Sequence, residues 1–336
     1  MKSVDFTTFL NARASLDPAG LAGIPEEYEA TWMSDSSPYD GRVDRLVFED
    51  DLGIAARLAV LRPGDASEAL FCFYGRRPDL EEAARRDLFS SLRRWLDEQG
   101  IASVQGPIEF STWHPYRFVC EQGKSPWFPG EQPMPDYWFR DFLDAGFNES
   151  ARFASILVQN LGQSIDASLA RGVDRGVSAL NIDIVTGPDI VELLPTHYHL
   201  FKSIFQDNYA YSPIEYEEFR ALYSGIATLD AALIMVADDQ GPVGIAFSYN
   251  IGPYDAIAGE EPVLTSVLKT IGVDPRARGQ RIGVGVTYLT HQYWLERGFG
   301  QVIHAYMKSD NVSHAMSSRL GPTLREYALV RWSAAA

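Results

Sequence analysis

Hydrophobic and polar positions in the second half of the chain follow first the pattern of a strand and then that of a helix. Residues 263–273 are rich in β-branched and apolar side chains, which predicts a buried strand. The strand is expected to end at Asp274-Pro275, because proline has no backbone donor and biases the residue before it toward an extended conformation. Apolar positions then predict a helix over residues 280–296. The other elements expected in this half are strands over residues 181–185, 232–237, 243–249, 301–307 and 326–330, and helices over residues 189–206, 213–223 and 311–320.

The first half of the chain repeats a similar order of apolar segments. Residues 80–99 place leucines and a tryptophan on one face, which predicts an amphipathic helix stopped by Gly100. The similar order and size of the two halves indicate a tandem duplication, with a first domain over residues 1–165, a linker over 166–178 and a second domain over 179–336. The remaining elements expected in the first half are strands over residues 45–49, 54–61, 69–74, 101–104 and 153–161, and a helix over residues 137–143.

Charge and composition narrow the classes of function. The 336 residues include 29 basic and 45 acidic side chains, a formal net charge of -16, which disfavours a nucleic-acid partner. No apolar run is long enough to span a bilayer, and the first residues lack the apolar segment of a secretory signal. Cys72 and Cys120 fit neither a disulfide framework nor a metal site, and His197 and His199 cannot share one helix face. We therefore expect a cytoplasmic protein without a metal.

The turn after residues 263–273 carries the most specific motif in the chain. The segment from Val273 to Gly285 reads V-D-P-R-A-R-G-Q-R-I-G-V-G, so glycines and arginines stand where a helix begins. Backbone N–H groups at such a place bind anions. The segment resembles the acyl-CoA loop of the GCN5-related N-acetyltransferase superfamily, and Gln280, Gly283 and Gly285 satisfy the spacing of that loop. Arg281 stands where the commoner wording of the motif has a glycine, and we expect it to add a phosphate contact.

The resemblance implies an α+β protein with two tandem domains, each a mixed, mostly antiparallel sheet flanked by helices. It also implies that only the second domain binds the cofactor, because the corresponding segment of the first, residues 75–82, lacks the glycine pair and has two acidic residues at the helix start. The cofactor is then acetyl-CoA or another acyl-CoA. The residues that the resemblance assigns to it are Ile271, Gly272, Val273, Arg278, Gly279, Gln280, Arg281, Ile282, Gly283, Val284, Gly285 and Asn311.

The resemblance says less about the residues that move protons. Members of the superfamily often have a tyrosine as general acid near the end of the last helix, and that position is Ser317 here. Ser318, Tyr306 or a water molecule could replace the tyrosine, and His304 is the first candidate for a general base. Asn311 has two open roles, contact with pantetheine or a helix N-cap.

Acceptor recognition in the family comes from the loop between the first two helices and from a hairpin. Tyr209, Tyr211 and Tyr249 lie in those segments, where aromatic side chains could either bind an amine or pack against the first half.

Three functions remain open at this stage. The first is an N-acyltransferase that passes an acyl group from acyl-CoA to a small-molecule amine by direct attack, since neither cysteine lies in the cofactor domain. The second has the same fold but takes the acyl group from an acyl carrier protein. The third is a non-catalytic module that senses CoA or binds a partner, which the missing tyrosine would suit. The sequence also leaves a homodimer open.

Overall fold

The computed structural model describes residues 1–16, 24–64, 68–165, 177–257 and 261–334. Two compact units make up the chain. The first consists of residues 1–122, 130–152 and 327–336, and the second of residues 123–129 and 153–326. Each unit is a mixed sheet flanked by helices, so the predicted α+β class is confirmed.

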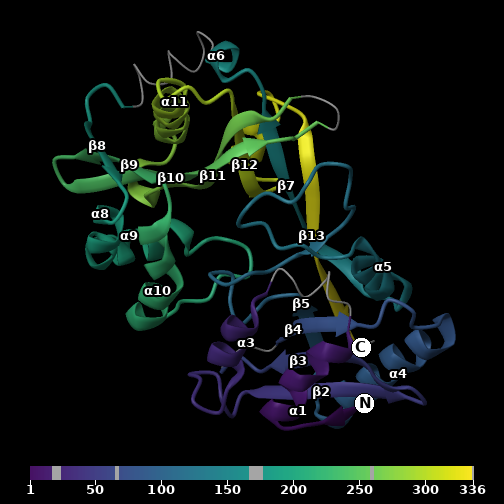
Figure 1. Cartoon of the computed structure of the whole chain (residues 1–336). Helices are drawn as coiled ribbons and strands as arrows, with labels where there is room; N and C mark the ends of the chain where they lie inside the picture. The colour runs from purple at the N-terminus through teal and green to yellow at the C-terminus, as the bar shows by residue number, and fades with distance from the viewer. Residues whose placement is uncertain (17–23, 65–67, 166–176, 258–260, 335–336) are drawn as a thin grey trace. The chain divides into compact units, whose positions relative to one another are not determined.

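The sheet of the first unit is antiparallel except at one strand pair. Its strands follow the order β1-β2-β3-β4-β5-β13, and β4 and β5 are the parallel neighbours. Figure 1 labels two helices of this unit, α4, which lies between β4 and β5 in sequence, and α5, which follows β6. The elements are β1 (Lys2–Ser3), α1 (Phe6–Asn11), α3 (Glu26–Met33), β2 (Val43–Asp50), β3 (Gly53–Leu61), β4 (Ala69–Arg76), α4 (Glu82–Glu98), β5 (Ser103–Gly106), β6 (Phe118–Val119), α5 (Asp136–Asp144), the start of β7 (Asn148–Val158) and the end of β13 (Thr323–Ser333).

Aromatic rings and buried ion pairs, among them Arg57 with Glu29, stabilise the first unit. Phe142 of α5 stacks on Phe71 of β4 with ring centroids 4.6 Å apart. On β3, the fully buried Arg57 guanidinium donates to both carboxylate oxygens of Glu29 in α3, at 2.5 and 2.8 Å. Arg13 donates to the same carboxylate at 2.5 Å. A buried charge is tolerated only when it is paired. The Glu29 carboxylate is therefore needed as the counter-ion of the buried Arg57 guanidinium.

The second unit has a sheet in the order β7-β12-β11-β10-β9-β8, in which β11 and β12 are parallel. Helix α11 lies on one face of this sheet and α9 on the other (Figure 1). The elements are the end of β7, α6 (Leu161–Ser164), β8 (Asn181–Thr186), α8 (Asp189–Glu192), α9 (Leu194–Phe205), α10 (Tyr216–Tyr223), β9 (Ala231–Asp238), β10 (Gly241–Tyr254), β11 (Val263–Val273), α11 (Ile282–Leu295), β12 (Gln301–Lys308), α12 (Val312–Ser317) and the start of β13.

Most elements lie where the sequence predicts them, and three differ. The helix expected over residues 189–206 is divided into α8 and α9, with Pro195 in the first turn of α9. Residues 153–158 of β7, expected to complete the first half, pair with β12 of the second unit. Residues 327–333 of β13, expected to complete the second half, pair with β5 and β6 of the first unit. Each strand has 11 residues, enough to contribute to both units. The predicted linker over residues 166–178 lies outside the described residues except for its last two positions.

Candidate acyl-CoA site

The parallel strands β11 and β12 separate part of the way along their length. Their pairing runs from Thr265 opposite Gln301 to Leu268 opposite His304 and then stops. Strand β11 continues to Val273, where its other side is still paired with β10. A register shift at the β10–β11 pair leaves Lys269 outside the ladder. Residues 270–273 therefore have no strand partner on the β12 side within the described part of the chain, and we call them the open edge of β11.

Strand β12 bends away at the same level. Its register with β7 shifts between His304 and Met307, and Tyr306 has a left-handed backbone, with φ of 59°. The Tyr306 N–H donates to Ser155 Oγ at 3.4 Å, which fixes the bulge on β7. A bulge of this kind ends regular pairing and re-aims side chains. The Tyr306 ring consequently lies beside the open edge, with Lys269 Nζ 3.9 Å from its centroid.

Two of the arginines in the predicted loop have protein partners. Arg276 donates to Asp238 at 2.8 Å and to the Gly241 carbonyl at 3.0 Å, so it ties the loop to the β9–β10 hairpin. Arg278 forms an ion pair with Asp207 at 2.8 Å. The side chain of Arg278, which the resemblance assigns to the cofactor, is thus paired within the protein in this structure.

Arg281 differs from the other two arginines. It is exposed and has no hydrogen-bond or ion-pair partner in the described part of the chain. Its backbone is left-handed, with φ of 65° and ψ of 13°, at the N-cap of α11. Glycine adopts this conformation at little cost, whereas a residue with a Cβ is strained in it. The structure thus explains why a glycine is usual at this position and leaves the Arg281 guanidinium available to a ligand.

The first turn of α11 has backbone N–H groups next to Arg281 that have no acceptor within the helix. The Gly285 N–H is the first to bond within the helix, to the Arg281 carbonyl at 3.1 Å. The N–H groups of Ile282, Gly283 and Val284 come before it and have no intrahelical acceptor, as in any first helical turn. Together with the helix dipole they favour an anion.

Two of the glycines assigned to the cofactor lie close to side chains of other segments. A Cβ on Gly272 would lie 2.4 Å from Ile204 Cγ2 of α9, and one on Gly285 would lie 2.6 Å from Val177 Cγ1. The missing side chains therefore make room for packing within the protein. A Cβ on Gly283 would lie 3.6 Å from Val273 Cγ2, which is an ordinary contact distance. Gly279 has a left-handed backbone, and a Cβ on it would meet no atom within 4 Å in the described chain.

His304 lies in a buried row of three polar side chains. Its Nδ1 is 2.7 Å from Ser317 Oγ, and its Nε2 is 2.8 Å from His291 Nε2. All three side chains are at most 1% exposed. Burial lowers the pKa of His291 to about 4 and holds the pKa of His304 well below its usual range, with His291 adding to the effect. A base that accepts a proton from an amine needs an accessible nitrogen, so this geometry does not suit the direct roles expected for His304 and Ser317.

The two histidines make stability depend on pH. His291 has a folded pKa of about 4 against 6.5 in the unfolded chain, so between these values the unfolded state binds more protons. The free energy of unfolding should fall as pH drops below 6.5, by at most about 1.4 kcal/mol per pH unit for this group. Urea denaturation at pH 7.5 and pH 5 measures the loss. His291→Gln should reduce the loss, and the exposed control His199→Gln should not; equal losses in all three proteins would contradict this assignment.

The tyrosines expected to bind the acceptor have different surroundings. Tyr249 is buried, and its hydroxyl donates to the Pro129 carbonyl at 2.9 Å, so it anchors residues 123–129 and is not directed at a substrate. Tyr254 donates likewise to Pro126 at 2.5 Å. Tyr209 is partly exposed, with Lys308 Nζ 5.3 Å from its ring, and burial raises the pKa of Tyr211.

Two features of this site were not visible in the sequence. Residues 123–129 belong to the second unit, where Ser125 donates to the Ala256 carbonyl at 2.7 Å and Phe128 lies against Tyr306. The contact between His291 and His304 had no local signal in the sequence. Asn311 occupies the N-cap position of α12, but its side chain makes no capping hydrogen bond. Of the two roles left open for Asn311, side-chain capping is therefore not observed.

Within the described ranges, no group of histidine, cysteine and acidic side chains is arranged to hold a metal ion. A search of the same residues found no helix with the length and hydropathy needed to cross a bilayer.

Comparison with known proteins gives distant structural likenesses. No protein-family model matches the chain, and no curated protein matches it either. The chain is similar to the tandem GNAT protein from the clavulanic acid biosynthesis pathway, at 13% identity and a TM-score of 0.49, over 88% of this chain and 83% of that one. It is also similar to a GCN5-related N-acetyltransferase from Sphaerobacter thermophilus, at 14% identity and a TM-score of 0.49, over 99% and 94% of the two chains. Likeness at these identities and scores carries no argument about activity, so the proposals below rest on the site geometry.

Proposed function

We propose that the second unit binds acetyl-CoA or another acyl-CoA and transfers its acyl group to a small-molecule amine. One observation supports this more than any other. The open edge of β11, residues 270–273, is followed, after the short turn at Pro275–Ala277, by the first turn of α11, where N–H groups without an intrahelical acceptor stand beside Arg281. The edge suits the amide groups of pantetheine, and the helix start suits pyrophosphate.

The chemistry follows from the same geometry. The amine nitrogen attacks the thioester carbonyl, the C–S bond breaks, and CoA leaves as a thiolate that takes up a proton. Tyr306 is the expected proton-transfer residue that lies beside the edge, and water is the other carrier of the proton. Direct attack is favoured over an acyl-cysteine intermediate, because Cys72 and Cys120 both belong to the first unit.

A module that senses CoA without turnover is the second candidate. The observation in its favour is the buried row of His291, His304 and Ser317. His304, the expected base, and Ser317, which stands in place of the tyrosine, are hydrogen-bonded to each other in this row. The same fold could also take the acyl group from a carrier protein, which presents phosphopantetheine without its nucleotide. A cytoplasmic location is proposed with either function, in line with the free thiols of the two cysteines.

Turnover distinguishes these candidates. The full-length protein is incubated with acetyl-CoA and a panel of small primary amines, and release of the CoA thiol is followed with a thiol reagent. An acyltransferase releases thiol only when an amine is present and forms one amide for each thiol. Binding of acetyl-CoA without thiol release over the panel would favour the sensor. Turnover with acyl-phosphopantetheine on a carrier protein, but not with acetyl-CoA, would favour the carrier-dependent reaction.

A further inference from the structure

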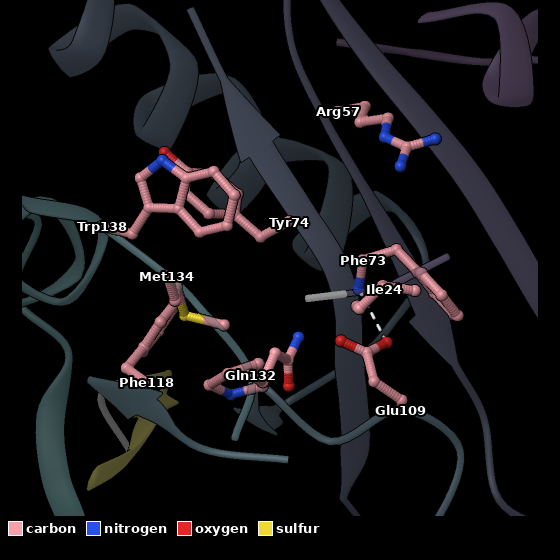
Figure 2. A pocket seen from close by; sticks show the side chains of 10 residues that line it. Ile24, Arg57, Phe73, Tyr74, Glu109, Phe118, Gln132, Met134 and Trp138 are labelled. Carbon is pink, nitrogen blue, oxygen red and sulfur yellow. Dashed lines mark hydrogen bonds between the residues drawn. The ribbon is translucent and has the colours of Figure 1, made fainter. Parts of the chain in front are cut away.

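Strand β4 corresponds to β11 in the first unit, where it pairs with β5 over two residues and is then closed by the chain itself. Beyond this pairing, the Ile108 N–H donates to the Phe71 carbonyl at 3.0 Å. The Phe73 N–H donates to the side chain of Glu109 at 2.9 Å, drawn as a dashed line in Figure 2. Aromatic rings border the space that is left, which has room for about one water molecule (Figure 2). A pantetheine arm is far larger than this space, so β4 does not provide a second site of this kind.

The first half of the sequence instead contributes a segment to the second unit. Residues 123–129, which we call the strap, come between β6 and α5 in sequence but belong to the second unit. Tyr249 and Tyr254 of β10 donate to two carbonyls of the strap, and Arg325 of β13 donates to a third. The two prolines of the strap have a fixed φ. Little of the strap backbone is therefore free to change its conformation.

Phe128 brings the strap into contact with Tyr306. The two ring centroids are 5.9 Å apart, with 34° between the ring planes, and the Phe128 side chain is 1% exposed. The Lys269 ammonium lies 3.9 Å from the centroid of the same Tyr306 ring. Tyr306 itself is only partly buried. Space for an amine beside Tyr306 is therefore limited by the Phe128 ring and by the Lys269 side chain.

We propose that Phe128 sets the width of the amine that the second unit accepts, and that the acceptors are narrow, unbranched primary alkylamines. This inference rests on the acyl transfer proposed above, in which the amine attacks the thioester beside Tyr306. An amine with a ring or a branch close to its nitrogen would collide with the Phe128 ring. The hydrogen bonds to the strap backbone oppose a movement of this ring away from the amine.

Two amines of different width test this inference. Propylamine and cyclohexylmethylamine have amino groups of similar basicity, and only the second carries a ring. The full-length protein is given acetyl-CoA and either amine, and kcat/KM is obtained for each from the release of the CoA thiol. The wild type should prefer propylamine. Phe128→Ala should raise the ratio of kcat/KM for cyclohexylmethylamine to that for propylamine by about tenfold or more, because even one methylene group in an apolar site changes kcat/KM by about 10–200-fold.

The ratio is the readout because a general loss of activity or stability lowers both rates and leaves their ratio unchanged. Phe128→Leu removes less of the side chain and should raise the ratio by a smaller factor, which tests the inference even if Phe128→Ala fails to fold. Trp127→Ala is the matched control. Trp127 is the neighbouring aromatic residue of the strap and packs against the Arg325 guanidinium, 4.1 Å from its ring, so its loss should not change the ratio.

The outcomes separate this inference from the proposed function. Calorimetry should give the same acetyl-CoA affinity for the wild type and for the Phe128 variants, because the substitution leaves the open edge of β11 and the first turn of α11 intact. An unchanged ratio in the Phe128 variants, or an equal shift in Trp127→Ala, would overturn the inference and leave the acyl transfer standing. Thiol release with no amine of the panel would overturn the acyl transfer itself, and this inference with it.

Discussion

Replacing Arg281 by glycine is expected to weaken acetyl-CoA binding by about tenfold or more while making the protein more stable. The loss of affinity follows from the guanidinium, which has no partner within the described chain and stands beside the unpaired donors of α11. A charge-assisted hydrogen bond to phosphate contributes about 1.5–3 kcal/mol, which is tenfold or more in affinity. The gain in stability follows from the left-handed backbone, where glycine removes about 1 kcal/mol of strain.

Arg281→Gln is the matched control for this substitution, because it removes the charge and keeps the Cβ. It should lose affinity as Arg281→Gly does and gain no stability. Calorimetry measures the affinity and urea denaturation the free energy of unfolding. An Arg281→Gly protein that binds acetyl-CoA as tightly as the wild type, or more tightly, would show that Arg281 crowds the cofactor.

Replacing Glu29 by glutamine is expected to cost about 3–5 kcal/mol in the free energy of unfolding, the largest effect of a single change that we predict for stability. Glu29 and Arg57 are both fully buried, and the carboxylate accepts from Arg57 and Arg13 together. The neutral amide would leave the Arg57 charge in the interior without its counter-ion. Urea denaturation monitored by tryptophan fluorescence and circular dichroism measures the loss.

Two further proteins test the reason for this effect. Glu26→Gln removes an exposed charge from the same helix and should change stability by less than about 0.5 kcal/mol. The double variant Glu29→Met, Arg57→Met replaces both charges by apolar side chains of similar length and should recover much of the loss. A single Glu29→Gln variant as stable as the Glu26 control would contradict the role given to the pair.

The sequence predicts local features of the acyl-CoA site well, because proline, glycine and strand patterns act over short distances. Strand β11 spans the predicted residues 263–273, and the turn at Asp274-Pro275 follows directly. Arg281 was identified as a departure from the motif, although its left-handed backbone could only be seen in the structure.

Contacts between distant residues could not be predicted in this way. His291 and Ser317 each lie 13 residues from His304, on separate elements, and their meeting depends on how α11 and α12 pack on β12. The packing of Gly272 could not be predicted for the same reason, because it depends on Ile204 of α9, which is distant in sequence. Glu109 had no sequence signal at all, because an acidic residue in a loop is usually solvated and only the fold buries this one.

Calorimetric titration of the full-length protein with acetyl-CoA is the decisive measurement for the proposed acyl-CoA site. We expect one binding site per chain, in the second unit, because the open edge of β11 and the first turn of α11 occur together there. The corresponding strands of the first unit enclose an aromatic cavity and the Glu109 carboxyl group. The absence of binding at millimolar acetyl-CoA, or two equal sites per chain, would contradict it.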